Sequence, residues 1–393
     1  MVEGFSLKEA ERVKVIERET NHDVKAVEYF LKEYLENSED TRDLKEFVHF
    51  CCTSEDINNL AYARMIKDAL NEVIYPRLEA FVQSLSELAL ETADMPLLAL
   101  THGQAATPTT FGREMAVFVH RLKHQLETLK SIQIQGKFNG ATGSFNAHSV
   151  AYPAVDWEKV AADFVENRIG VKYQPVSTQI ECHDYIGEIS DAVSRIATIL
   201  IGFSRDMWSY ISRNVLKLRV NADEVGSSTM PHKVNPIDFE NAEGNLGLTV
   251  SVFRHYSEKL LISRFQRDLS DSTVLRSLGL AFGHFLISID SLAKGIDKIN
   301  LNESVCEKEL EANWSVLAEA VQTVMRKHKL NRPYERLKEF TRGCEVGRSS
   351  LLAFIKSIES ELPSEEIHRL LALTPKTYIG LAPSIAKTYG RFP

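Results

Sequence analysis

Long stretches of the chain carry an apolar residue at every third or fourth position. This spacing places apolar side chains on one face of a helix that packs against other helices at a shallow angle. The pattern runs through Ile189–Tyr210, Phe239–Leu260 and Leu278–Ile296, with shorter versions through Leu78–Leu88 and Met115–Ile132. No proline between residues 236 and 333 forces a break in these helices. The sequence therefore predicts a central bundle of about five long helices.

Weaker patterns flank this bundle on both sides. We expect an all-α fold with three parts, a small N-terminal helical domain over 1–44, the bundle over 45–296 and a C-terminal helical domain over 297–393. In the last part, helical patterns run around Glu303–His328 and Glu335–Ile358. Strand signals are few, and Gly170–Tyr173 is one modest candidate.

The length of the apolar stripes bears on association. A helix of about 25 residues spans roughly 37 Å, which is long for a globular protein. Stripes this long usually need more than one partner, so we expect self-association, with a monomeric bundle as the alternative.

Composition narrows the class of protein. The 393 residues are 44% hydrophobic and 25% charged, which is typical of a globular chain with a sizeable core. The formal net charge of −8 argues against nucleic-acid binding. The charged N-terminus, an odd cysteine count without CxxC and the lack of an 18-residue apolar run indicate a reduced, cytoplasmic protein without a membrane anchor.

The densest polar chemistry lies in Gly226–Pro236, with the sequence GSSTMPHKVNP. Hydroxyls, an imidazole, an ammonium and a carboxamide share a loop that glycine and two prolines keep from being helical. The helical pattern after Pro236 places the loop at a helix N-terminus, which suits an anion such as a carboxylate. Ordinary turn chemistry is the alternative.

Four other polar clusters are candidates for a site. Thr20–Lys25 and His49–Asn59 each precede a helix, so Asn21, Asp23 or Thr53 could simply be helix caps. Thr101–Pro108 places His102 between threonine and glycine in a loop, where it can exchange a proton near neutral pH. Gln266–Arg276 carries two arginines that could hold a phosphate or pair with nearby aspartates.

Two further patterns are discounted. His120 and His124 have zinc-compatible spacing but lack a third ligand, so no metal site is expected. The glycine-rich stretch GKFNGATGS, Gly136–Ser144, lacks the ending of a phosphate-binding loop, and the absence of GxGxxG argues against a nucleotide redox cofactor.

The clusters taken together are similar to one known family. GSSTMPHKVNP resembles the signature loop of the fumarase/aspartase superfamily, and the full set resembles the adenylosuccinate lyase family. The motifs that carry this resemblance occur in the family's order, TNHDVKAVEYF, TSEDINN, THGQAATP, STQIECHDY, GSSTMPHKVNPIDFEN and QRDLSDSTVLR.

The resemblance implies anti β-elimination of fumarate from adenylosuccinate to give AMP, and from the related imidazole carboxamide ribotide. It implies no cofactor, and sites shared by three subunits of a homotetramer around a core of long helices. Residues that would handle the succinyl carboxylates and their surroundings are Asn21, His22, Asp23, Thr53, Ser54, Gln179, Lys233 and Asn235. Those that would hold the phosphate are Arg267, Ser272 and Arg276.

The assignment of the base differs between the two lines of reasoning. From the residues alone, His232 or His102 would be the base, because serine is intrinsically a very weak one. The resemblance instead implies that Ser227 is the base and that His102 is the acid that protonates the departing purine nitrogen.

The chain departs from the family pattern at one end. Family members carry a longer segment before the first motif, including an Arg-Tyr pair that contacts the nucleotide, whereas this motif begins at Thr20 here. We therefore expect altered phosphate affinity for the chain as written. Alternatives are another fumarate-releasing lyase, such as argininosuccinate lyase or fumarase, and a catalytically silent homologue on the same scaffold.

Overall fold

A computed structural model describes residues 4–37, 39–219, 230, 233–342 and 346–392. The chain forms two compact units, each assembled from three separate segments. The first unit contains Met1–Pro76, Thr128–Ser194 and Ser251–Ala281, and the second contains Arg77–Glu127, Arg195–Val250 and Phe282–Pro393. The described residues are predominantly helical, which confirms the predicted all-α class. The predicted boundaries at 44/45 and 296/297 stay a prediction.

The first unit is built from short helices around the beginnings and ends of longer ones. Its helices are α1 (Leu7–Thr20), α2 (Asp23–Glu36), η2 (Arg42–Phe47), α3 (Ser54–Ala69), η3 (Leu70–Ile74), α6 (Asn146–Ala151), α7 (Trp157–Asp163), η4 (Phe164–Ile169) and α10 (Ser270–Leu275). Strand β5 (Gln135–Gly136) pairs in parallel with β6 (Lys172–Tyr173), where the sequence suggested a strand.

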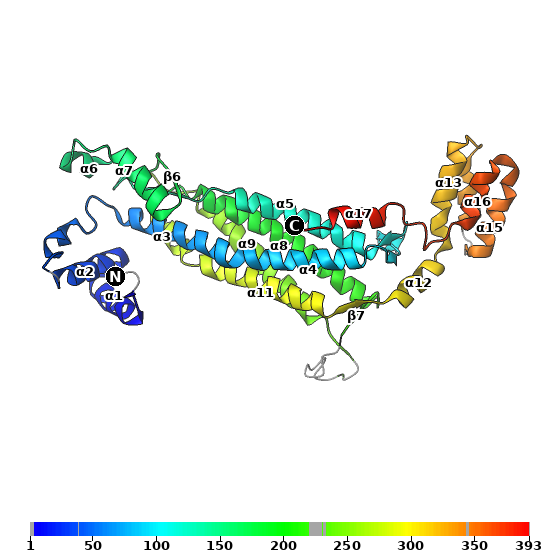
Figure 1. Cartoon of the computed structure of the whole chain (residues 1–393), viewed down its shortest axis with the longest axis horizontal. Helices are drawn as coiled ribbons and strands as arrows, with labels where there is room; N and C mark the ends of the chain where they lie inside the picture. Colours follow the sequence, from blue (N-terminus) through cyan, green and yellow to red (C-terminus); the bar gives the residue numbers. More distant parts are fainter. Residues whose placement is uncertain (1–3, 38, 220–229, 231–232, 343–345, 393) are drawn as a thin grey trace. The chain divides into compact units, whose positions relative to one another are not determined.

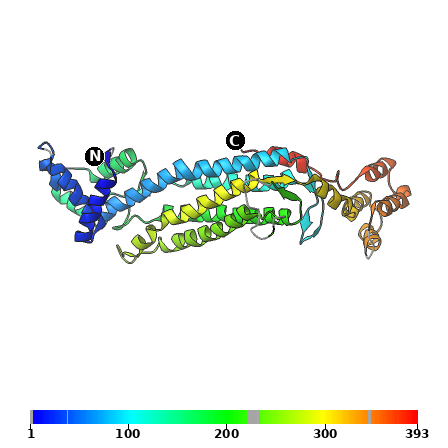
Figure 2. The same cartoon turned by 90° about the horizontal axis from the view of Figure 1, so that it is seen from below.

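The long helices carry the central bundle. They are α4 (Tyr75–Glu91), α5 (Phe111–Ser131), α8 (Asp184–Ser212), α9 (Ile237–Lys259) and α11 (Leu278–Asp297). Their segments within the second unit lie side by side (Figures 1 and 2). This arrangement confirms the predicted bundle.

Burial explains why these segments are helices. The apolar positions at alternating spacings of three and four are buried throughout α9 and α11, and in α8 from Ile189 to Met207. At the centre, the ring of Phe203 packs edge-on against those of Phe118 and Phe81, with centroids 5.3 and 6.0 Å away. Each fully buried phenylalanine contributes about 1.5–3 kcal/mol from removal of its apolar surface from water.

The opposite face of α11 is only partly covered. Leu280 and Ile287 are exposed by 59% and 48%. By length and composition alone, Ser270–Asp297 is apolar enough to cross a membrane, a test that core helices of globular proteins also pass. An apolar helix with one uncovered face is expected where further helices pack against it.

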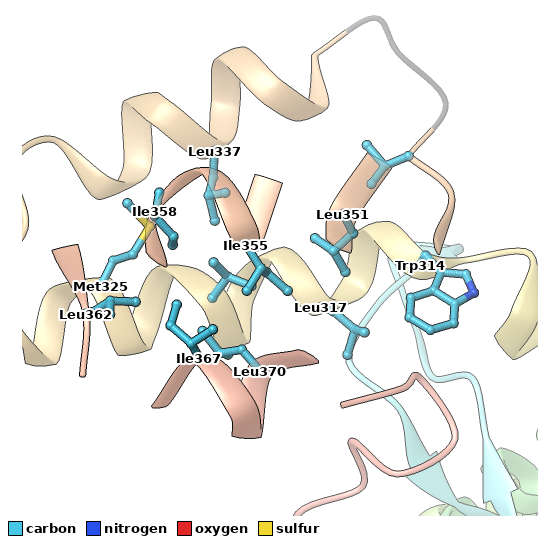
Figure 3. Packing of buried hydrophobic residues seen from close by; sticks show 12 residues of the cluster. Trp314, Leu317, Met325, Leu337, Leu351, Ile355, Ile358, Leu362, Ile367 and Leu370 are labelled. Carbon is cyan, nitrogen blue, oxygen red and sulfur yellow. The ribbon is translucent and has the colours of Figure 1, made fainter. Parts of the chain in front are cut away.

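The C-terminal part of the second unit has its own hydrophobic cluster (Figure 3). Its core residues come from η5 (Trp314–Leu317), α13 (Ala318–Lys327), α14 (Pro333–Thr341), α15 (Arg348–Ser357) and α16 (Ser364–Ala372), and from the segments next to them. The same part of the chain also contains α12 (Glu303–Glu311), η6 (Glu359–Glu361) and α17 (Ala382–Tyr389). The two ranges with helical patterns are helical but not continuous, since the first contains α12, η5 and α13 and the second contains α14 and α15. The breaks allow Met325, Leu337 and Ile355 to face one core.

Short strands close the second unit. Strands β1 (Pro96–Leu97) and β4 (Thr109–Thr110) pair around an inner hairpin of β2 (Leu100–Thr101) and β3 (Gln104–Ala105), and β7 (Leu216–Leu218) pairs with β8 (Ile299–Leu301), all antiparallel. The inner hairpin carries His102.

Candidate functional site

A cavity of about 410 Å³ lies in the first unit, where the polar clusters of four separate segments meet. Its lining includes most of the residues predicted to bind substrate, Asn21, His22, Asp23, Thr53, Ser54, Gln179, Arg267, Ser272 and Arg276. The rest of the lining is Glu17, Glu55, Asn58 and Leu269. These segments are far apart in sequence, so the fold alone brings them together.

The joint between α1 and α2 supplies one side of the cavity. Asn21 ends α1 in a left-handed conformation, with φ of 52° and its N–H bonded to the Glu17 carbonyl. His22 then caps α2, and its Nδ1 accepts the Lys25 N–H at 3.3 Å. The N-cap of α2 is therefore His22, not Asn21 or Asp23. The sharp turn presents three successive polar side chains to the cavity.

The N-terminus of α3 supplies a second side. Thr53 is the cap and Ser54 the first helical residue, as the sequence suggested. The Asp56 carboxylate accepts the Thr53 N–H at 2.9 Å, which fixes the start of the helix. The free N–H groups of such a terminus and their hydroxyl neighbours favour an anion.

Two arginines approach the cavity from the segment around α10. Arg267 Nη1 lies 3.0 Å from Glu55 Oε1 and 3.7 Å from Asp271 Oδ2. This nitrogen is buried and makes no well-aligned hydrogen bond within the described part of the chain. Arg276 lies 3.9 Å from Asp23 and is 65% exposed. Both arginines therefore pair with carboxylates and also line the cavity.

Gln179 completes the cavity opposite α3. Its Nε2 donates to the Ala141 carbonyl at 2.8 Å, and its own N–H donates to the Gln266 carbonyl at 3.3 Å. The amide is thus oriented from two sides, by the glycine-rich stretch and by the segment that carries Arg267.

The sequence analysis did not identify His183, a buried histidine that lies next to Asp271. His183 Nε2 lies 3.3 Å from Asp271 Oδ2, and its Nδ1 lies 3.3 Å from Glu181 Oε2. Burial alone would lower the pKa of His183, but the hydrogen bonds to Asp271 and Glu181 outweigh it and raise this pKa to about 9. His183 is therefore a cation at neutral pH.

The same network sets the charge of Asp271. Burial raises the pKa of this carboxyl, but the hydrogen bond from His183 and the charge of Arg267 hold it below its usual value. The available sequence signal was the pair of motifs STQIECHDY and QRDLSDSTVLR, each with an acid next to or near a cation.

Three other predicted residues, His102, Lys233 and Asn235, are not among those that line this cavity. Lys233 and Asn235 belong to the second unit and precede α9, where Lys233 is exposed and its N–H donates to the Met230 carbonyl at 3.1 Å. Ser227 and His232 lie outside the described residues.

His102 lies on the hairpin of the second unit. It and Gly103 form the two-residue turn between β2 and β3, with φ of 54° and 73°. A tight hairpin turn of this kind requires positive φ at both positions, which glycine adopts readily and histidine does not. His102 is exposed, and it is one of ten non-glycine residues in the described part of the chain with a positive φ.

Sequence comparisons assign the chain to a family. A family described as "Lyase" matches residues 1–250, and one described as "Adenylosuccinate lyase C-terminal" matches residues 263–379. Proteins named adenylosuccinate lyase are similar over nearly the whole chain. The Escherichia coli K12 protein is 52% identical over 97% of this chain and 83% of its own length.

The chain belongs to the adenylosuccinate lyase family. The Haemophilus influenzae member is 53% identical over 97% of this chain and 83% of its own length, and the Legionella pneumophila Corby member is 51% identical over 99% and 85%. The resemblance found in the motifs is thereby confirmed.

A structural comparison addresses the fold alone. The crystal structure of 3-carboxy-cis,cis-muconate lactonizing enzyme from Pseudomonas putida matches with a TM-score of 0.75 at 20% identity. The match covers 99% of this chain and 85% of that one. The arrangement of helices in this family is therefore shared with proteins of very different sequence.

Proposed function

We propose that this chain is a carbon–nitrogen lyase that eliminates fumarate from adenylosuccinate to leave AMP. By the same reaction it would release fumarate from the related imidazole carboxamide ribotide. The observation that carries the proposal is the convergence of Asn21–Asp23, Thr53–Ser54, Gln179 and the arginine segment on one cavity. Family membership at about half identity over nearly the whole chain supports the same reaction.

The cavity has groups suited to both ends of this substrate. We assign the phosphate to Arg267, Ser272 and Arg276, because a guanidinium can make two parallel hydrogen bonds to phosphate oxygens. We assign a succinyl carboxylate to Thr53 and Ser54 at the N-terminus of α3, with Gln179 opposite. The side chains at the turn from α1 to α2 would surround the reacting part.

Elimination needs a base, an acid and stabilisation of charge. Loss of the proton beside a carboxylate develops further negative charge on that carboxylate. Lys233 and Asn235 are suited to stabilise it. Ser227 is the proposed base and His102 the proposed acid that protonates the departing nitrogen. No step of this scheme requires a metal or an organic cofactor.

The proposed groups belong to different units, so the scheme also concerns assembly. We propose a homotetramer in which each site takes residues from three subunits. Support comes from the uncovered apolar face of α11, which would be buried by helices of other copies. We further propose that the protein works in the cytoplasm.

The test is to incubate the purified chain with adenylosuccinate and to follow AMP and fumarate by chromatography. Equal release of both products is the expected result. Release of fumarate from argininosuccinate or malate, with none from adenylosuccinate, would favour another lyase of the superfamily. A folded tetramer that releases nothing from any of these substrates would indicate a silent homologue.

A further inference from the structure

A buried ion pair lies behind the cavity and has no contact with its lumen. The side chains of Lys137 and Asp56 are both fully buried, and Lys137 Nζ lies 2.8 Å from Asp56 Oδ1. Neither residue lines the cavity. Burial lowers the pKa of the Lys137 ammonium, and the charge of Asp56 opposes that shift. Such a pair contributes little net stability compared with apolar side chains, so its presence calls for another reason.

The Asp56 carboxylate connects two segments of chain. Besides Lys137, it accepts the N–H groups of Thr53 at 2.9 Å, Asn139 at 3.1 Å and Gly140 at 3.1 Å. One of these donors is Thr53, the residue that caps α3, and the other two lie in the glycine-rich stretch. The carboxylate therefore ties the N-terminus of α3 to that stretch.

A second contact set extends the connection along α3. The Asn59 side chain accepts the Lys137 N–H at 2.8 Å and donates to the Lys137 carbonyl at 3.0 Å. Since Asp56 and Asn59 are one helical turn apart, both the backbone and the ammonium of Lys137 are fixed to the same face of α3.

The far end of the glycine-rich stretch holds Gln179. The Ala141 carbonyl accepts the Gln179 amide at 2.8 Å. Gly143, with φ of 81°, lies so close to the neighbouring segment that a Cβ would be 2.4 Å from the Ser177 carbonyl oxygen. Only glycine permits this approach. The stretch thus spans the distance between the start of α3 and the segment of Gln179.

We propose that Lys137 is a positioning residue, which acts through Asp56 and the stretch Lys137–Gly143 to fix Thr53, Ser54 and Gln179 in one geometry. This inference rests on the proposed function, because it assigns these three cavity residues to the succinyl end. At the phosphate end, Arg276 lies 3.9 Å from Asp23 and Arg267 lies 3.7 Å from Asp271, two carboxylates outside this connection, although Glu55 of α3 also pairs with Arg267.

Because the cavity has a succinyl end and a phosphate end, the proposal can be tested by comparing their affinities. General destabilisation would weaken binding at both ends alike. In Lys137→Met, we expect the affinity for fumarate to fall about tenfold or more, the usual effect of losing well-placed hydrogen bonds to a charged group. The affinity for AMP should fall clearly less than the affinity for fumarate, because Arg267 and Arg276 keep the carboxylates of Asp271 and Asp23 as partners. Both are measured as product inhibition of adenylosuccinate turnover and by calorimetry with fumarate or AMP alone.

Two further variants test the same proposal if Lys137→Met does not fold. The double variant Asp56→Asn/Lys137→Met removes both buried charges together. Gly143→Ala leaves the ion pair intact and displaces the segment of Gln179. Both should weaken fumarate more than AMP. Val165→Ala, a fully buried position of the same unit away from the cavity lining, is the stability control and should weaken neither.

The outcomes separate the two proposals. A wild-type chain that releases no AMP and fumarate overturns the proposed function, and the role of Lys137 with it. An active wild type whose Lys137, Asp56 and Gly143 variants lose both affinities equally, or neither, overturns the positioning role alone.

Discussion

The cavity of the first unit and the hairpin of the second unit hold their polar side chains in opposite ways. Arg267 and Gln179 are fixed by neighbours within their own unit, through contacts with Glu55 and with Ala141. His102 lies exposed on a two-residue turn, where only the backbone is constrained. The cavity residues proposed to bind the charged ends of the substrate are therefore oriented before the substrate binds. The proposed proton donor, His102, is instead exposed to solvent.

The most severe test of this comparison is removal of the proposed base. Ser227→Ala should reduce turnover of adenylosuccinate by about 10²–10⁴, the usual contribution of a positioned proton carrier. Binding should persist, because the cavity residues are unchanged. Steady-state kinetics and calorimetry measure the two effects. Near-normal turnover would remove Ser227 from the role and favour His232 or His102 as the base.

The second test asks whether the two regions combine between subunits. His102→Gln should lose about 10²-fold or more in turnover. Mixing it with Ser227→Ala under conditions that exchange subunits should restore measurable activity, because some sites then receive both intact groups. Each variant exchanged with itself is the control. If the mixture stays inactive although subunits exchange, His102 and Ser227 of one site do not come from different subunits.

The third test addresses the phosphate end of the cavity. Arg267→Met should raise the KM for adenylosuccinate by about 10- to 100-fold, the effect of losing hydrogen bonds to a charged partner. Arg264→Met is a matched control, since that arginine is 80% exposed and pairs with Asp268 four residues on. Equal KM values for the two variants would contradict the assignment.

The fourth test measures stability and not activity, and it concerns the buried cation His183 beside Asp271. The pKa of His183 is raised to about 9 in the folded chain, above its ordinary value. Its stabilising contribution is therefore complete below about pH 6.5 and is lost as pH rises through about 9, with a size on the order of 3 kcal/mol. Thermal unfolding between about pH 6 and pH 10 should show a steeper loss for wild type than for His183→Gln. Parallel curves would mean that His183 is not charged in the fold.

Several features of the fold followed from the sequence because they depend on neighbours along the chain. The spacing from Ile189 to Met207 fixes one face of α8, and every one of these positions is buried. Thr53 before an acidic first turn fixes the start of α3. The patterns around residues 303–328 and 335–358 also correspond to helices, but periodicity did not show where each range divides into shorter helices, because those breaks depend on packing into one C-terminal core.

The site divides along the same line. The residue types and their order identified the polar clusters and the family, since chemistry of this density is written in short motifs. The contacts of Lys137 with Asp56 and of His183 with Asp271 span 81 and 88 residues of sequence. No local sequence pattern predicts such a pair, because the packing of the helices determines which distant segments come into contact.

The sequence by itself determined the helices, their buried faces and the chemical groups available. Only the tertiary structure decided which of those groups share a cavity and which charges lie buried behind it.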